Sequence, residues 1–286
     1  MNSTGSTRWL LHEAIKMALL LCAIFSSFIV LTILGFLSYF MAPVVVNGEF
    51  RELLGTIWNP ASNSFGIVPM LIGSLCVSFT AVILAYPVAT GLSFYCNGIG
   101  PRFLGNKLRT LIEFMVCVPT VVYAFVSAIL LAPMLRSMLQ HGSGFSWLAA
   151  SLTLTMLVLP TIFLMINASM REASSKFRVL ALSLGMTQAQ TLAWVITPQA
   201  KRGFKAGLIL GLGRAVGDTI ISLMLAGNAA QFPDSVLDSV RTLTAHIALV
   251  VATDPNSLAY QSIFFCGLLL CVISAMTNLG LKMVSK

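Results

Sequence analysis

The stretch GFKAGLILGLGRAVGDT, residues 203–219, combines regularly spaced glycines with two opposite charges inside an apolar region. Each residue of an α-helix advances by about 100°, so Gly203, Gly207 and Gly211 fall on one face. Arg214 and Asp218 fall within the same arc of about 80°. Glycines spaced by four allow a second membrane helix to approach closely. The stretch therefore predicts a membrane helix whose packing face also carries charge.

The whole chain has the composition of a membrane protein. Of its 286 residues, 57% are hydrophobic and 9% are charged, against roughly 25% charged in an average soluble domain. A bilayer core requires about 20 apolar residues per helix, and a window of that size finds six candidate spans. They lie at about 17–41, 67–95, 111–135, 146–170, 206–230 and 258–281. We expect an all-α integral membrane protein with about six transmembrane helices, consisting of a cytoplasmic segment 1–16 and one transmembrane domain 17–286.

The basic residues predict the orientation of these spans. With the amino terminus inside, 13 of the 17 Lys and Arg residues fall in cytoplasmic segments, whereas three fall in outer loops and Arg214 lies within a span. The positive-inside rule then places both termini in the cytoplasm. The formal net charge of +8 reflects this orientation, so its expected neighbours are membrane lipids with anionic headgroups, and no nucleic acid. The 13 are Arg8, Lys16, Arg102, Lys107, Arg109, Arg171, Lys176, Arg178, Lys201, Arg202, Lys205, Lys282 and Lys286.

Two interpretations fit the charges in the fifth predicted span. A single Arg or Asp at the centre of a membrane helix costs on the order of 2.5–3.5 kcal/mol, so both should face protein or a water-filled path. Arg214 and Asp218 could simply neutralise each other at positions i and i+4. Alternatively, Arg214 offers positive charge to a passing anion and Asp218 orients it. Glu113, near the start of the third span, is either a group on the same path or an interfacial charge.

Several patterns of enzymes and metal proteins do not occur in the sequence. It contains no G-x-x-x-x-G-K-[ST] motif to hold ATP, and GLGRAVG does not fit the G-x-G-x-x-G spacing. His12, His141 and His246 are scattered without metal-ligand spacing, and no Ser, His and acid grouping suggests nucleophilic catalysis. We expect no catalytic residue, no metal site and no cofactor bound by this chain. Energy for uphill transport must then come from another subunit.

The longest predicted cytoplasmic segment, about 171–205, is too long for a simple connection. It contains Gly185 and Pro198, and Leu192, Val195 and Ile196 have helical spacing between them. The pattern predicts two short helices that meet near Gly185.

Several motifs, in order along about 58–281, resemble the permease subunits of ABC importers, and specifically the C-type (PstC) permease of phosphate importers. Trp58-Asn59-Pro60 followed by FGIVPMLIGSL is similar to W-x-P and F-G-x-x-P-x-x-x-G-[ST]-L. Glu113 with VPTVVYAF resembles E-x-x-x-x-I-P-S-V-V-Y-G, and ALSLGMT resembles A-L-A-L-G-A-T. GRAVGDT resembles A-R-A-x-G-E-T, and RTLTAHIAL resembles the stretch before the last span of that family.

The resemblance implies a type I ABC importer permease that carries inorganic phosphate across the bacterial inner membrane. Its implied partners are a second, PstA-type permease, a cytoplasmic PstB-type ATPase dimer that binds ATP and Mg, and an extracytoplasmic phosphate-binding protein. That protein would meet the outer loops, about 42–66, 141–145 and 231–257. The residues implied to lie on the substrate path are Arg214, Asp218 (Glu in the family), Thr219 and Glu113.

The segment 171–205 resembles the family's coupling loop, E-A-A-x3-G-x9-I-x-L-P, which docks on the ATPase. Aligned on Gly185, the loop places Ala181, Val195 and Pro198 at coupling positions. Val179 stands where the family has glutamate. Val179 leaves open a membrane scaffold or sensor that has the same fold but has lost transport. A permease for another oxyanion (sulfate, molybdate or phosphonate) is the other alternative, because a guanidinium binds any of these anions.

Overall fold

The computed structural model describes residues 3–140, 142–254 and 257–285. Lys286, in the predicted cytoplasmic set, and His141, in a predicted outer loop, lie outside the described residues. The chain divides into two compact units, Met1–Phe50 and Arg51–Lys286.

The first unit is dominated by one long helix, α1, which runs Ser3–Val46 and is continuous across residue 16. Its part His12–Val46 has a mean hydropathy of 2.7 and is long and apolar enough to cross a membrane. The side chains of Leu19 and Leu31 are exposed. Exposed leucines are typical of a membrane helix, since lipid chains are as apolar as leucine.

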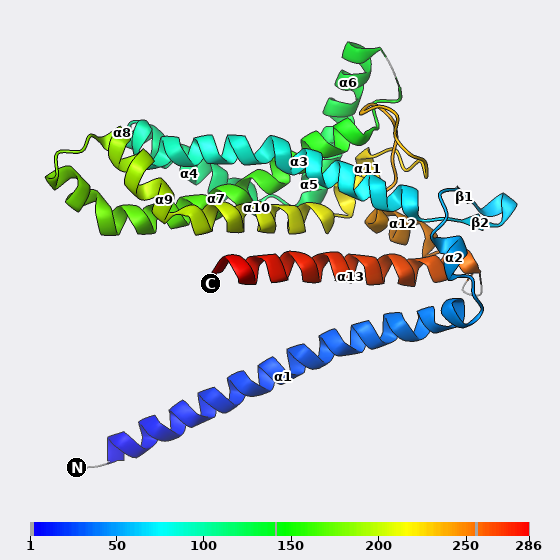
Figure 1. Ribbon diagram of the computed structural model, residues 1–286, viewed down its shortest axis with the longest axis horizontal. Helices are drawn as coiled ribbons and strands as arrows, with labels where there is room; N and C mark the ends of the chain where they lie inside the picture. Colours follow the sequence, from blue (N-terminus) through cyan, green and yellow to red (C-terminus); the bar gives the residue numbers. More distant parts are fainter. Residues whose placement is uncertain (1–2, 141, 255–256, 286) are drawn as a thin grey trace. The chain divides into compact units, whose positions relative to one another are not determined.

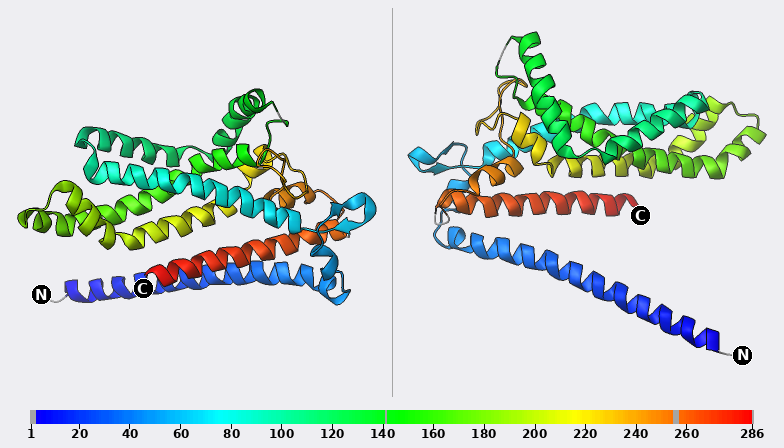
Figure 2. Two further views of the ribbon diagram at one scale, coloured as in Figure 1. Left: turned by 45° about the horizontal axis from the view of Figure 1, so that its top comes forward. Right: turned by 180° about the vertical axis from the view of Figure 1, so that it is seen from behind.

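The centre of the second unit is formed by α3 (Val68–Phe94), α7 (Trp147–Ser183) and α10 (Lys201–Val216). They lie side by side in Figure 1 and in both views of Figure 2. α13 (Leu258–Ser285) packs against α10. The buried residues of α3 and α7 include the small residues Ala81, Ala85, Ala149 and Ala150. Small residues let helix backbones approach closely, which replaces the hydrophobic driving force that lipid removes.

Hydroxyl groups add hydrogen bonds between α3 and α7. Ser151 Oγ donates to the Val77 carbonyl at 3.3 Å, and Thr155 Oγ1 donates to the Ala81 carbonyl at 3.2 Å. Asn97, in the π-helix η2 (Tyr95–Ile99) that extends α3, donates through Nδ2 to Asn167 Oδ1 at 2.7 Å. These bonds fix the register of the two helices, since sliding either one would leave polar groups unpaired.

The third predicted span, 111–135, is not one helix. α4 (Arg102–Cys117) ends at Val118, and a new helical stretch begins at Thr120, made of α5 (Thr120–Val126), η3 (Ser127–Leu131) and α6 (Ala132–Leu139). Pro119 separates them, because its ring disfavours helical backbone at the preceding residue. Val118 accordingly has ψ 123°, in the extended region. The stretch long and apolar enough to cross a membrane is Thr120–Leu139.

The fifth predicted span, 206–230, is also divided. α10 ends at Val216, and α11 (Ile220–Leu225) begins after Gly217, Asp218 and Thr219. Irregular chain then leads to α12 (Leu243–Val250), held by a bridge between Gly227 and Val240. Among the described residues, the continuous helices that could span a membrane are therefore five: His12–Val46, Val68–Ile99, Thr120–Leu139, Trp147–Ser183 and Leu258–Met283.

The segment 171–205 differs from its prediction in one respect. The first of the two expected short helices is the end of α7, which continues to Ser183. The chain does turn at Gly185, whose φ of +80° favours glycine. After it come α8 (Gln188–Gln190), the π-helix η4 (Thr191–Ile196) and α9 (Thr197–Gln199). A capping box between Thr187 and Gln190 starts this second part.

A small hairpin contacts α12. It follows α2 (Phe50–Leu53) and consists of β1 (Trp58–Asn59), the 3-10 turn η1 (Pro60–Ser62) and β2 (Ser64–Phe65), with Trp58 opposite Phe65. The Trp58 ring meets the His246 ring edge-on, with centroids 4.4 Å apart. His246 is fully buried, and its Nε2 lies 3.0 Å from Ser262 Oγ. Since that hydroxyl donates to the Ala259 carbonyl, Nε2 carries the proton and donates to it.

The buried His246 should make the stability of the chain fall with decreasing pH. Burial, followed by the positive charge of Arg241, lowers the pKa of His246 from 6.5 to about 3. Below pH 6.5 the unfolded chain binds a proton that the folded chain excludes, so stability is lost as the pH falls from 6.5 toward 3. The loss is about 1.4 kcal/mol per pH unit within that window. Thermal unfolding of the detergent-solubilised chain between about pH 7 and pH 4.5 measures it.

His246→Gln is the control for this effect, because glutamine can donate to Ser262 but does not titrate. Its unfolding temperature should depend less on pH than that of the parent chain. Equal slopes in the two proteins would contradict the assignment.

Candidate functional site

Arg214 lies in the last turn of α10, next to the break in that segment. Its side chain is exposed. Across the described ranges no ion pair joins Arg214 to an acidic side chain. A positive charge is favourable at a helix carboxyl end, where the carbonyl dipoles point. The guanidinium therefore lies exposed at a helix end that favours positive charge.

Asp218 forms no ion pair with Arg214 in the described ranges, and its side chain instead contacts the first turn of the next helix. Its Oδ2 accepts a hydrogen bond from the Ile221 N–H at 2.8 Å, which satisfies one of the first amides of α11. The Asp218 carbonyl accepts a further bond from Thr244 Oγ1 at 2.9 Å. No ion pair joins the two side chains in the described ranges. The break at Gly217 takes Asp218 off the face of α10.

Thr219 lines a cavity of about 340 Å³ beside this break. Thr244 from α12 and Ser274 from α13 also line it, together with Gly217 and several apolar side chains. Irregular backbone at membrane depth is tolerated where it is buried in protein or faces a water-filled space. The cavity provides such a space for the backbone around Gly217.

Tyr123 and Thr244 belong to this region, and sequence reasoning did not select either of them. Tyr123 Oη donates to the Met115 carbonyl at 2.9 Å and so bridges the break between α4 and α5. α5 and α11 are in contact, so the break at Pro119 lies near the break at Gly217. The motif VPTVVYAF contained the signal for Tyr123, since a proline after Val118 predicts a break that needs a hydrogen-bond partner.

Glu113 forms a local ion pair. Its Oε1 accepts a bond from Arg109 Nε at 2.8 Å, four residues earlier on α4. Both side chains are partly exposed, so the pair adds little to stability. In the described ranges Glu113 forms its ion pair with Arg109 and none with Arg214.

The three glycines of α10 lie against α7. A Cβ on Gly207 would come within 3.2 Å of the Ile162 carbonyl, and one on Gly211 within 2.6 Å of Ile162 Cγ1. A Cβ on Gly203 would overlap the side chain of Ser169. All three glycines are buried, whereas Arg214 on the same helix is exposed. The predicted stripe is therefore divided between a packing face and an exposed charge.

The predicted coupling residues lie around the turn at Gly185. Ala181 is buried in the last turn of α7, Val195 is half-buried and Pro198 is exposed. Leu192 and Ile196, which shared the predicted apolar face with Val195, are buried within the permease unit. They face the core because η4 packs on α7.

Other apolar side chains of the same segment are exposed. Val179 and Leu184 are each 76% exposed, and Trp194 is 78% exposed. Large exposed apolar groups beside polar ones are typical of a protein contact surface. Their exposure identifies which side chains of 171–205 are available to a partner.

Comparison with known proteins assigns the family. The model of the binding-protein-dependent transport system inner membrane component matches residues 89–286. The "Probable ABC transporter permease protein YqgH" of Bacillus subtilis (strain 168) is 30% identical over 248 residues, which cover 84% of this chain and 80% of that protein. The chain belongs to this permease family. This confirms the predicted family and makes the protein a membrane transport subunit.

Two further comparisons concern a curated relative and a solved structure. The "Phosphate transport system permease protein PstC" of Pasteurella multocida (strain Pm70) is 25% identical over 244 residues, covering 79% of this chain and 76% of that protein. The solved structure of the MetNI methionine ABC transporter in inward-facing conformations matches with a TM-score of 0.56 at 15% identity, covering 75% of this chain and 94% of that one. The predicted all-α fold of ABC importer permeases is confirmed.

Proposed function

We propose that this permease conducts inorganic phosphate into the cell as a subunit of an ATP-driven importer in the bacterial inner membrane. The observation that carries the proposal is the exposed Arg214 guanidinium, which forms no ion pair in the described ranges and which lies beside a helix break. Arginine at membrane depth is costly, and its fork of donors matches a tetrahedral oxyanion. The similarity to PstC supports phosphate as that oxyanion.

The partners follow from the family. A PstA-type permease would complete the path, and a PstB-type ATPase dimer would bind ATP and Mg and dock on segment 171–205. A phosphate-binding protein would deliver the substrate at the outer loops. No covalent chemistry is required of this chain, because ATP hydrolysis would shift the population between outward-open and inward-open states.

The geometry of the charges suits passage rather than tight binding. The Asp218 carboxylate accepts a hydrogen bond from the Ile221 amide and forms no ion pair with Arg214 in the described ranges. The exposed guanidinium would attract the anion, while the few polar groups around it would let the anion leave again. Thr219 would offer a hydroxyl in the adjoining cavity.

Uptake by cells that express this permease with its genetic neighbours tests the substrate. We expect uptake of radiolabelled phosphate that disappears when this chain is omitted and that persists in excess sulfate, molybdate or phosphonate. Arg214 cannot distinguish these anions, so the separate binding protein should supply the selectivity. Effective competition by one of them would replace phosphate with that oxyanion.

A scaffold or sensor without transport is the alternative favoured by Val179. Its side chain is exposed at the position where the family's coupling glutamate is expected. The reconstituted complex decides between the two functions. Substrate-stimulated ATP hydrolysis supports the importer, and its absence in a fully assembled complex supports the scaffold.

A further inference from the structure

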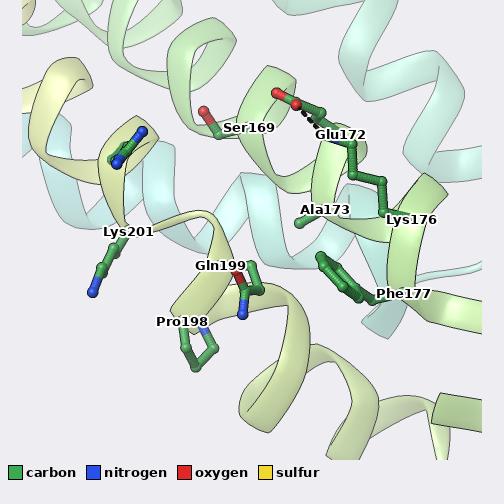
Figure 3. A pocket seen from close by; sticks show the side chains of 9 residues that line it. Ser169, Glu172, Ala173, Lys176, Phe177, Pro198, Gln199 and Lys201 are labelled. Carbon is green, nitrogen blue, oxygen red and sulfur yellow. Dashed lines mark hydrogen bonds and ion pairs between the residues drawn. The ribbon is translucent and has the colours of Figure 1, made fainter. Parts of the chain in front are cut away.

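A pocket of about 520 Å³ lies between the second half of α7 and the chain that enters α10. Ser169, Glu172 and Lys176 line it from α7, where the spacing of three and four places them on one face. Gln199, Lys201 and Arg202 line it from the other side. Figure 3 shows the labelled side chains of both walls around the opening.

The pocket results from the way α7 and α10 separate. Their close contact ends where Gly203 meets Ser169, because any side chain on Gly203 would overlap that serine. Beyond this contact α7 continues to Ser183, whereas the other wall is formed by α9 with its Pro198. The pocket lies between this end of α7 and the chain from Pro198 to Arg202.

The walls carry an excess of positive charge. Lys176, Lys201 and Arg202 contribute three cations, and Glu172 contributes one carboxylate. Glu172 Oε1 accepts from Lys176 Nζ at 2.7 Å, as the dashed line in Figure 3 shows. Lys201 forms no ion pair in the part of the chain that the structure describes, and its side chain is exposed.

We propose that this pocket binds a phosphate group, supplied by the headgroup of an anionic phospholipid or by free inorganic phosphate. Two lysines and an arginine on facing walls can surround the oxygens of one such group. Basic pockets between membrane helices on the cytoplasmic side are typical sites for anionic headgroups, and segment 171–205 is predicted to lie on that side. The size of the pocket accommodates a headgroup or a hydrated phosphate.

An occupied pocket would link α7 to the predicted coupling residues. Pro198 and Gln199 line the pocket and belong to α9, which follows the exposed Trp194. A phosphate group held by both walls would brace α9 against α7. The surface offered to the ATPase would then depend on lipid composition or on phosphate concentration.

Binding to the purified full chain in neutral detergent tests the proposal without requiring transport. Native mass spectrometry measures retention of phosphatidylglycerol against phosphatidylcholine, and calorimetry measures binding of inorganic phosphate. The double variant Lys176→Gln, Lys201→Gln should weaken the binding about tenfold, since two charged contacts are lost. Glu172→Gln should tighten it several-fold, because it removes a repelling charge and releases Lys176.

Lys205→Gln is the matched control, since it removes the same charge one turn along α10 from an exposed position that does not line the pocket. It should change either affinity by less than about twofold. Selective retention of phosphatidylglycerol would identify a lipid headgroup, and heat released on titration with phosphate would identify the free anion. Equal binding by the double variant and Lys205→Gln, for both ligands, would overturn the proposal.

Discussion

Arg214→Ala should reduce phosphate uptake to background while expression and assembly with the partner subunits stay intact. The substitution removes a bidentate donor whose charged hydrogen bonds contribute about 1.5–3 kcal/mol each to an anion on the path. The expected loss of rate is therefore on the order of 100-fold or more. Assembly should persist because the side chain is exposed and forms no ion pair in the described ranges. Uptake of radiolabelled phosphate and co-purification of the ATPase measure the two effects.

Arg214→Lys is the control for charge alone. Lysine keeps the positive charge but loses the planar fork, so uptake should be partly retained. Loss of assembly together with uptake in Arg214→Ala would contradict a role on the path and would indicate a packing role instead.

Gly211→Val should strongly destabilise the folded permease. A Cβ at Gly211 would lie 2.6 Å from Ile162 Cγ1, 2.8 Å from Ile162 Cδ1 and 3.2 Å from Val158 Cγ1. Ile162 is completely buried, so its neighbours restrict any movement away from Gly211. Overpacking of this kind costs about 1–3 kcal/mol, and a branched side chain should reach the upper end. Thermal unfolding in detergent and the yield of membrane-inserted protein measure the effect.

A second variant and a neighbouring glycine make this prediction specific. Ile162→Ala, combined with Gly211→Val, removes the opposing side chain and should restore part of the lost stability. Gly213→Ala should be tolerated, because its nearest foreign atom is Thr277 Oγ1 at 3.6 Å. Similar losses for Gly213→Ala and Gly211→Val would show that the close contact with α7 is not the cause.

Local sequence patterns predicted the structure well where it depends on residues close together in the sequence, as in a helix contact or a turn. The spacing of Gly203, Gly207 and Gly211 predicted a close helix contact, because glycine removes the only atoms that would keep two backbones apart. The positive φ at Gly185 appears where the sequence predicted a turn. These features depend on residues within a few turns of one another.

The same reasoning missed the breaks at Pro119 and Gly217. Hydropathy summed over a window of about 20 residues records composition and does not register whether the backbone hydrogen bonds continue. At Asp218 the capping bond to the Ile221 amide competes with the continuation of α10, and Thr244 supports the break from 26 residues away. The spacing rule assumes a continuous helix. It therefore placed Arg214 and Asp218 on one face, although α10 ends at Val216.

The amino-acid sequence by itself determined that the chain is a multi-pass membrane protein of the ABC permease family and which residues carry charge in its interior. Only the tertiary structure decided what those residues contact. It placed Asp218 on a helix cap, Glu113 on Arg109, and Leu192 and Ile196 in the core, and it formed the basic pocket between α7 and α10. The physical reason is that hydropathy records how apolar each segment is, whereas the partner of each polar group depends on where the helices break and on which segments then pack together.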